Sequence, residues 1–476
     1  MYPNDSATIF ISMKHYGFQY NPYIYLPKGT NMLNFLLYLA SAIIFGFFVY
    51  SARVSYSEKE KRASGRFILL ALILPWPFIL AALYNISPYI SGLLLLMFCF
   101  SALMFFLPLR RDKKREFIVP AIQIDERDTM FSRDLLLPDT PEYKAYYENH
   151  PENKPGDDSL RDNPGLLSER SVYYHPWIFS SAKANFELIE KNRQFVDGEI
   201  REKKVPVEPG DFSQQLKNLV RKYGAVSAGI TRLQDYHLYS HRGRKHNYGK
   251  PVQKHHEFAL AFTVEMDHEF VRNAPYALSV LESSRQYVRS GMLALWIAQF
   301  IRDMGYPARA HIDGEYEVVC PLVARDAGLG EIGRMGLLMT PELGPRVRIA
   351  VVTASVPLIP DGRKEEFSMI DFCTVCKKCA ENCPSNAIPF GDRKEIDGAL
   401  RWQIDQQVCF RYWTKVGTDC ARCMSVCPFS HPNNPLHNLV RYGIRNSSPF
   451  RKFALWMDDF IYGRKPRPLS INSSEF

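Results

Sequence analysis

Eight of the ten cysteines fall into two runs whose spacing is typical of iron–sulfur ligation. Each run has cysteines separated by two or three intervening residues and ends in Cys-Pro. A [4Fe–4S] cluster needs four converging thiolates, and in two-cluster ferredoxins the fourth is the last cysteine of the opposite run. The ten-residue gap after Cys409 indicates that this ligand arrives from a separate loop. We predict one cluster on Cys373, Cys376, Cys379 and Cys427, and another on Cys383, Cys409, Cys420 and Cys423.

Zinc is the alternative metal for these cysteines, because paired Cys-x2-Cys motifs also bind it. Two runs that both end in Cys-Pro favour iron–sulfur clusters over two zinc sites. The remaining cysteines, Cys99 and Cys320, leave no disulfide framework of the kind found in secreted domains. This cysteine usage indicates a reducing compartment.

Three uncharged apolar runs in the N-terminal third have about the length that crosses ~30 Å of hydrocarbon. Their ranges are 33–50, 67–84 and 88–108. Segments 51–66 and 109–116 each carry five basic and two acidic residues, so they supply +6 of the net charge of +9. Basic segments beside membrane spans are typical of the cytoplasmic side. We predict three transmembrane helices, an outside N-terminus and a cytoplasmic downstream chain. The alternative is a buried helical hairpin.

The small charge that remains away from the membrane flanks argues against a nucleic-acid partner. No small-residue cleavage site marks the first run as a cleavable signal, and no twin-arginine motif precedes it. Prolines and charged residues then dominate 117–176, which we predict to be a linker or an irregular arm.

An α/β segment follows the proline-rich region. Apolar spacing predicts helices over 212–223 and 279–305. Strands are expected at 226–233, 258–266 and 349–353, and the second of these is apolar enough for a sheet that is covered on both faces. The loop 237–256 holds five of the twelve histidines, and its irregular spacing favours a solvated or cofactor-facing loop over a metal site.

Two further motifs could serve a site in this segment. The first, AGLGEIGR at 327–334, gives a tight glycine turn whose spacing matches neither a Rossmann fingerprint nor a P-loop. The second, GPRVR, places Arg346 and Arg348 two residues apart on extended chain, where their side chains share a face. Either both arginines approach one site, or one of them forms a structural salt bridge.

The order of these motifs resembles the cobalamin-dependent reductive dehalogenase family. The resemblance runs over about 177–465 and includes YSHRGR, FALAFTVEMD, Tyr287, AGLGEIGR, TPELGPRVR, FCTVCKKCAENCPSNAI, SVCPFSHP and WMDDFIYGRKP. It implies a nitroreductase-like α/β core that binds a corrinoid base-off. Two clusters would then deliver electrons to cobalt for reductive cleavage of a carbon–halogen bond. No Asp-x-His-x-x-Gly motif is present, so no histidine ligand to cobalt is predicted.

The resemblance also assigns site residues. Tyr287 matches the proton donor, and counting along the motif gives Arg346 as the basic residue that assists it. Asp313 stands where the family has an asparagine. The implied cofactor contacts are Asp313, Gly328, Gly330 and Gly333. Family members are exported through a twin-arginine signal and held by a separate membrane partner, whereas this chain carries apolar runs of its own. We therefore expect a multi-pass inner-membrane enzyme that faces the cytoplasm, with quinol, ferredoxin or flavodoxin as electron donor.

The predicted fold is an N-terminal three-helix transmembrane anchor followed by an α/β core with an inserted ferredoxin-like domain. The expected segments are 1–116 (anchor), 117–176 (arm), 177–365 (core), 366–435 (two clusters) and 436–476 (a segment packed on the core). Two other functions stay open at this stage. One is an epoxyqueuosine-reductase-like tRNA enzyme, and the other is a membrane-bound electron carrier without a corrinoid.

Overall fold

The structure is a computed structural model that describes residues 32–106, 120–244, 247–364 and 367–470. The chain divides into two compact units. The first unit comprises Met1–Arg53 and Ser64–Met104, and the second comprises Val54–Ala63 and Phe105–Phe476.

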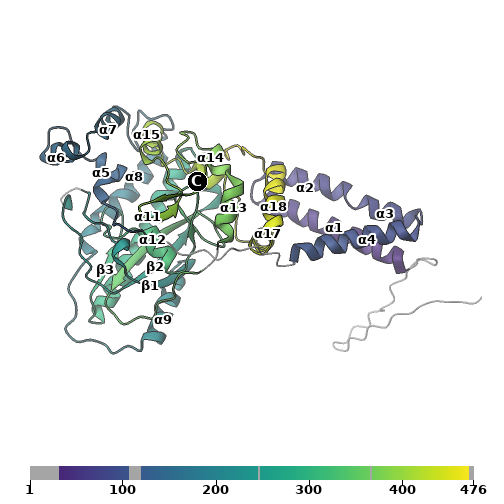
Figure 1. The fold of residues 1–476 in the computed structure, drawn as a ribbon, viewed down its shortest axis with the longest axis horizontal. Helices are drawn as coiled ribbons and strands as arrows, with labels where there is room; N and C mark the ends of the chain where they lie inside the picture. The colour runs from purple at the N-terminus through teal and green to yellow at the C-terminus, as the bar shows by residue number, and fades with distance from the viewer. Residues whose placement is uncertain (1–31, 107–119, 245–246, 365–366, 471–476) are drawn as a thin grey trace, which may run out of the picture. The chain divides into compact units, whose positions relative to one another are not determined.

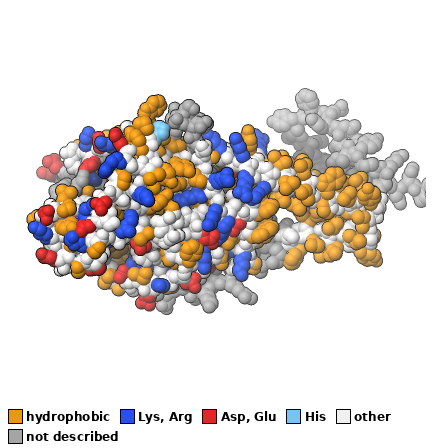
Figure 2. Space-filling model, turned by 90° about the horizontal axis from the view of Figure 1, so that it is seen from above, with side chains coloured by type: hydrophobic (Ala, Val, Ile, Leu, Met, Phe, Trp, Pro, Cys, Tyr) orange, Lys and Arg blue, Asp and Glu red, His pale blue; other side chains and the backbone are white. Residues whose placement is uncertain are grey.

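The first unit is helical and carries many exposed apolar side chains, as Figure 2 shows on one of its faces. Its helices are α1 (Met32–Ser57), α2 (Lys61–Ile73), α3 (Trp76–Leu83) and α4 (Pro88–Phe106). Pro75 and Pro77 lie at the junction of α2 and α3. The helix is interrupted there because proline cannot donate a backbone hydrogen bond.

Two stretches of the described chain, Met32–Ser57 and Lys61–Leu83, are long and apolar enough to cross a membrane. The third apolar stretch, Pro88–Ser101, is shorter. Two of the three predicted spans therefore meet this criterion. The basic segment 109–116 lies outside the described residues.

The second unit is built on a four-stranded antiparallel sheet (Figure 1). Its strand order is β1 (Ser227–Arg232), β2 (Phe258–Glu265), β6 (Val347–Ala354) and β3 (Ala308–His311). β2 pairs with β6 over its whole length, from Phe258 opposite Ala354 to Glu265 opposite Val347.

Both faces of this sheet are buried. Leu260 and Phe262 face the cluster that contains helices α9 (Pro209–Lys222) and α11 (Ala277–Asp303). Ala259 and Ala261 face the opposite cluster, which contains α12 (Cys320–Asp326). The prediction of a sheet that is covered on both sides is confirmed, because successive side chains of a strand point to opposite faces.

Further elements extend this core. They are α8 (Pro176–Lys191), α10 (His268–Arg272), the hairpins β4 (Glu331–Ile332) with β5 (Leu338–Met339) and β7 (Lys394–Ile396) with β8 (Ala399–Arg401), and the helices α13 (Ser368–Cys376), α14 (Lys378–Glu381), α15 (Gln406–Val416), α16 (Arg422–Ser425), α17 (Pro435–Asn446) and α18 (Ser448–Ile461). Helix α8 packs along α11, and α17 and α18 pack on each other and on α13.

The proline-rich region is more ordered than the sequence predicts. It forms three short helices, α5 (Met130–Arg133), α6 (Pro141–Asn149) and α7 (Lys154–Arg161). Prolines lie in the first turns of α6 and α7, a position where their fixed φ favours helix initiation. Arg133 forms a buried ion pair with Asp157 at 2.8 Å, which fastens α7 to α5.

We predict that Gly229→Ala destabilises the second unit. A Cβ at Gly229 would lie 2.1 Å from the carbonyl oxygen of Ala327, so β1 and the end of α12 must separate. Overpacking of this kind costs about 1–3 kcal/mol. Chemical denaturation should show a lower midpoint for this variant. Gly391→Ala is the matched control, because no atom lies within 4 Å of its added Cβ. Equal midpoints for the two variants would contradict the packing argument.

Candidate active site and cluster ligands

The structure brings the eight cysteines of the two runs together in two sets of four. Burial raises the pKa of the Cys427 thiol well above its ordinary value, and the neighbouring thiols of Cys373 and Cys376 raise it further. One small cavity is lined by all four members of this first set, which are Cys373, Cys376, Cys379 and Cys427. These are the four cysteines that the sequence assigns to one cluster.

The second set contains Cys383, Cys409, Cys420 and Cys423. Burial raises the pKa of Cys420 to about 12, and the thiols of Cys409 and Cys383 contribute to that shift. The two sets adjoin, because Cys423 and Cys383 pack against the buried cluster that holds Cys379. Adjoining sets would keep two redox centres close enough for electron transfer between them.

A buried arginine lies beside the first set. The Arg334 side chain is fully buried and donates to the carbonyl oxygens of Pro389 and Gly391 at 2.7 Å and of Cys373 at 3.2 Å. Its guanidinium also lies 4.6 Å from the ring centroid of Trp402. Arg334 thus ties the glycine turn to the ligand loop and places a positive charge next to a thiolate site.

Tyr287 lies on α11 beneath a guanidinium from the neighbouring strand. The Arg348 guanidinium, which β6 carries, lies 4.0 Å from the ring centroid of Tyr287. Burial raises the pKa of Tyr287, whereas the positive charge of Arg348 lowers it. The phenol is therefore protonated at neutral pH and has a cation beside it.

The arginine at this site is Arg348 and not the predicted Arg346. Arg346 is 1 % exposed and points away, where its Nε donates to the carbonyl oxygen of Ser430 at 2.7 Å. Its Nη1 donates to Glu265 at 2.8 Å. Arg346 thus forms the structural salt bridge that the sequence left open for one of the two arginines.

A hydrogen-bonded chain holds Arg348 in place. Its Nη2 donates to the Ser283 hydroxyl at 2.6 Å, and Ser283 donates to the Asp419 carboxylate. Asp419 precedes Cys420, a member of the second cysteine set. The residue next to the phenol is therefore connected through two side chains to the loop of a cluster ligand.

Asp313 lies in the same region but contacts a second arginine. Its carboxylate is 3.6 Å from Nη1 of Arg244, and Arg244 is also 3.4 Å from the buried Glu126. The charges of Asp313 and Arg244 both act on the pKa of Tyr287, with opposite signs. The negative charge of Asp313, the residue expected as asparagine from the family resemblance, is thus paired with the positive charge of Arg244.

Sequence reasoning missed several of these neighbours. They are Arg244, Ser283, Tyr316 and Asp419. Burial raises the pKa of Tyr316 well above its ordinary value, and Tyr287 adds to the shift. A weak signal existed for Asp419, because it directly precedes a ligand cysteine. Single polar residues such as Ser283 carry no pattern of their own.

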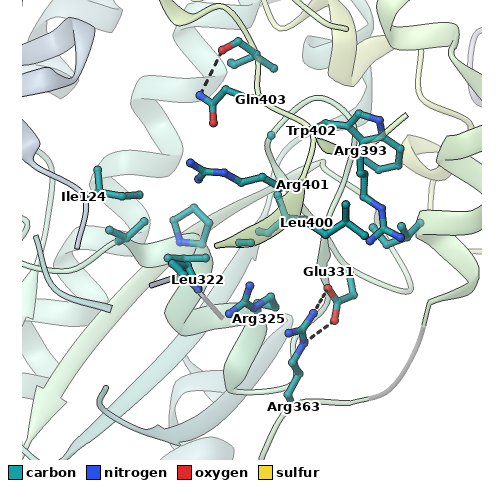
Figure 3. Close-up of a pocket in the computed structure, with 18 of the residues that line it drawn as sticks. Ile124, Leu322, Arg325, Glu331, Arg363, Arg393, Leu400, Arg401, Trp402 and Gln403 are labelled. Carbon is teal, nitrogen blue, oxygen red and sulfur yellow. Dashed lines mark hydrogen bonds and ion pairs between the residues drawn. The ribbon is translucent and has the colours of Figure 1, made fainter. Parts of the chain in front are cut away.

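A cavity of about 630 Å³ lies near the first cysteine set (Figure 3). Its volume is within the range of small-molecule and cofactor sites. Ile370, on its wall, packs with Cys373 and Trp402, so the cavity reaches the first cysteine set. The arginines that line it are Arg325, Arg363, Arg393 and Arg401.

The arginines that line this cavity differ in how many of their hydrogen-bond donors have a partner. Figure 3 shows Arg363 ion-paired with Glu331, at 2.8 Å. Arg401 has its Nε buried without a hydrogen-bond partner in the described chain. An orphaned buried donor beside aromatic and aliphatic walls is suited to a large ligand with amide and phosphate groups.

The predicted glycine contacts pack against protein backbone. A Cβ at Gly330 would lie 2.1 Å from the carbonyl oxygen of Met339, and one at Gly328 would lie 2.7 Å from that of Gly362. A Cβ at Gly333 would meet Met339 and approach Cys373 at 3.8 Å. These glycines allow close packing beside the first cysteine set, while Gly336 of the same turn lines the cavity.

Comparison with known proteins agrees with this geometry. Residues 372–431 match the 4Fe-4S dicluster domain. The tetrachloroethene reductive dehalogenase of Sulfurospirillum multivorans is 38 % identical over 217 residues, which cover 44 % of this chain and 43 % of that protein. A tetrachloroethene reductive dehalogenase of Desulfitobacterium hafniense is 32 % identical over 211 residues, or 41 % of this chain and 38 % of that protein. The matches thus span less than half the length of these relatives.

Solved structures resemble a larger part of the chain. The catabolic reductive dehalogenase NpRdhA in complex with 3-bromo-4-hydroxybenzoic acid superposes with a TM-score of 0.61 and 25 % identity, covering 75 % of this chain and 49 % of that one. An epoxyqueuosine reductase of Staphylococcus aureus matches less, with 29 % identity over 111 residues that cover 22 % of this chain and 28 % of that protein. In its dicluster motif, in sequence over the matched parts and in fold, this chain is similar to reductive dehalogenases.

Proposed function

We propose that this chain removes halide reductively from an organohalide, using electrons from two [4Fe–4S] clusters and a bound cobalamin. The observation that carries this proposal is the guanidinium of Arg348 at 4.0 Å from the ring of Tyr287. That pair lies in a core that also holds two adjoining sets of four cysteines. The tRNA-modifying alternative is supported only by a shorter match.

The overall reaction consumes two electrons and one proton per halide. An organohalide R–X becomes R–H and X⁻, so the carbon–halogen bond breaks and a carbon–hydrogen bond forms. The bound corrinoid supplies the low-potential metal chemistry at the carbon–halogen bond. Tyr287 donates the proton from its hydroxyl to the carbon, and the charge of Arg348 stabilises the tyrosinate that remains.

The residues that would hold the corrinoid line the cavity of about 630 Å³. Trp402 and Leu322 supply apolar wall, and Arg401 supplies a donor for a phosphate or amide group. His237 is no candidate for a ligand to cobalt, because its Nε2 is bonded to Asp326 at 2.8 Å in the buried core. The donor set of the cavity therefore suits a corrinoid without a protein histidine on the metal.

The charged neighbours of Tyr287 set the electrostatic field at its hydroxyl group. Arg244 is paired with Asp313, so Arg348 is the guanidinium in contact with the phenol, and the carboxylate nearest to it along the hydrogen-bonded chain is Asp419. A substrate that loses halide near Arg348 leaves an anion beside a guanidinium, which lowers the free energy of the charge-separated products. The aspartate at 313 would discourage an anionic substrate group on its own side.

The anchor and the segment limits are also part of this proposal. Three apolar helices in 1–116 would hold the enzyme in the inner membrane, and the basic segment 51–66 would lie on the cytoplasmic side. The core would span 177–365, with the clusters in 366–435 and a packed segment at 436–476. Quinol, ferredoxin or flavodoxin would then supply electrons from the membrane or the cytoplasm.

We predict that the anaerobically reconstituted full chain contains about one cobalt and about eight iron atoms. With a reduced low-potential donor it should release halide from halogenated phenols or chloroethenes. Tyr287→Phe should retain both metals and lose about 10²- to 10⁴-fold in kcat, because only the proton donor is removed. Iron without cobalt, and no halide release, would instead indicate an electron carrier.

We predict that Cys427→Ala removes one cluster and leaves the other. Its iron content should fall to about four per chain, because Cys427 supplies a ligand to the first set only. Cys320→Ala is the control, since burial raises the pKa of that thiol to about 12 and it belongs to neither set. Iron analysis and electron paramagnetic resonance measure both. Equal iron in Cys427→Ala and the parent would refute the assignment.

Arg348→Gln and Arg346→Gln should have different effects. Loss of Arg348 should lower kcat about 10²- to 10³-fold. It should also move the alkaline limb of the pH–rate profile to higher pH, because the charge that lowers the pKa of Tyr287 is gone. Loss of Arg346 leaves Glu265 and two carbonyl oxygens unpaired, so it should lower thermal stability first. A parent-like pH profile in Arg348→Gln would contradict the role of Arg348.

A further inference from the structure

A second group of metal-ligating side chains lies outside the active site. Glu58, His431 and His437 each offer one ligand atom, and these atoms lie within 4.8 Å of one another. Glu58 belongs to the short segment Val54–Ala63 of the second unit. His431 follows the ligand Cys427 by four residues, and His437 lies in the first turns of α17. The three residues therefore join segment 54–63 to the cluster-bearing region.

The geometry of the three side chains is close. Nε2 of His437 lies 3.0 Å from both carboxylate oxygens of Glu58. The rings of His431 and His437 are stacked with centroids 4.4 Å apart and planes at 11°. Asn434 donates from Nδ2 to Oε1 of Glu58 at 2.8 Å, which orients the carboxylate toward the imidazoles.

Segment 54–63 is fastened to α10 by the two residues that follow Glu58, so the carboxylate is held in place by its neighbours. Arg272 donates from Nε to Glu60 at 2.6 Å, and both side chains are about nine-tenths buried. Lys59 forms an ion pair with Glu269 on the same helix, α10. A carboxylate that the backbone already positions loses less conformational entropy on binding a ligand.

The candidate ligand atoms are imidazole nitrogens and a carboxylate oxygen, and the side chains that carry them are largely buried. The side chains of Glu58 and His437 are each 7 % exposed, and that of His431 is 13 % exposed. Nδ1 of His431 is buried and has no hydrogen-bond partner within the described ranges.

A carboxylate also stands behind one imidazole. Asp458 places Oδ1 3.6 Å from Nε2 of His431, the nitrogen opposite the unpartnered Nδ1. Metal-bound histidines commonly have a carboxylate at their second ring nitrogen, which raises the basicity of the ligand. Two imidazoles and one carboxylate form a set that zinc accepts, with an open fourth position.

We propose that Glu58, His431 and His437 bind one divalent transition metal ion of the zinc class, and that this ion fastens segment 54–63 beside the first cluster. Two metal–ligand bonds of about 2.0–2.1 Å span at most about 4 Å, so metal binding requires the two imidazoles to turn out of their stacked arrangement and point their nitrogens at one ion. The site is separate from the proposed dehalogenation and does not depend on it.

The test uses the full chain in detergent micelles with both clusters reconstituted, and zinc is the probe. After exposure to micromolar zinc and desalting, elemental analysis should give about one zinc per chain with iron unchanged at about eight. X-ray absorption at the zinc edge should show nitrogen and oxygen ligands at about 2.0–2.1 Å. Glu58→Gln and His437→Ala should each weaken zinc binding at least about tenfold, the loss typical of even a second-sphere change.

His437→Cys gives a positive signature that does not depend on losing the site. It should keep zinc and add one sulfur ligand at about 2.3 Å to the absorption spectrum. His150→Ala is the matched control, since His150 is 39 % exposed and belongs to no such group among the described residues, and it should bind zinc as the parent does.

Three results would overturn the proposal. The first is that the parent chain does not retain zinc. The second is that it retains zinc on sulfur ligands and loses iron, which would indicate that zinc occupies the cysteine sets. The third is that Glu58→Gln and His437→Ala bind zinc as tightly as His150→Ala does. Iron content in every variant shows whether the cluster region is folded.

Discussion

The structure depends on keeping eight thiols together in two adjoining sets, five of them buried and three half-buried. Burial raises the pKa of Cys409 to about 11 and that of Cys379 to about 12, so without metal these groups carry protons that a cluster must displace. Ligation and folding of this region are therefore linked, because the metal supplies the charge that the buried thiolates need. Positively charged side chains near the cysteine sets also help to hold this region together. Arg334 binds carbonyl oxygens of the ligand loops, and Lys378 is buried against Asp458 of α18.

The cysteine sets and the sheet could be predicted from sequence because both leave regular patterns. Spacing identified the two sets of ligands, and an unbroken apolar run identified β2 as a strand buried on both faces. The choice between Arg346 and Arg348 could not be made in this way. Side-chain alternation holds only within a strand, and β6 begins at Val347, so Arg346 lies outside the pleat and Arg348 inside it. Counting along a family motif carried no information about where the strand begins.

Other features depend on contacts between residues far apart in sequence. The proline-rich region forms helices because its prolines stand in first turns and because Arg133 pairs with Asp157, a contact that composition does not reveal. Glu58 and His437 are 379 residues apart and meet only after segment 54–63 lies on the cluster region. Arg244 likewise reaches Asp313 across the core. Each of these pairs is set by tertiary packing, for which single residues carry no periodic signal.

The link from Tyr287 to the second cysteine set has a physical consequence for the proposed reaction. Arg348 touches the phenol ring, binds Ser283 and, through it, Asp419 beside Cys420. A change of charge on a cluster at Cys420 would act on Asp419 and Arg348 across a buried region, where electrostatic interactions are screened less than in water. The proton donor and an electron donor would then be linked by one chain of contacts, in which Arg348 touches the phenol ring and hydrogen bonds join Arg348, Ser283 and Asp419. Because dehalogenation needs two electrons and one proton at the same carbon, a rigid connection between the two sources favours their delivery in one place, and the buried Ser283 hydroxyl is the element that makes this connection.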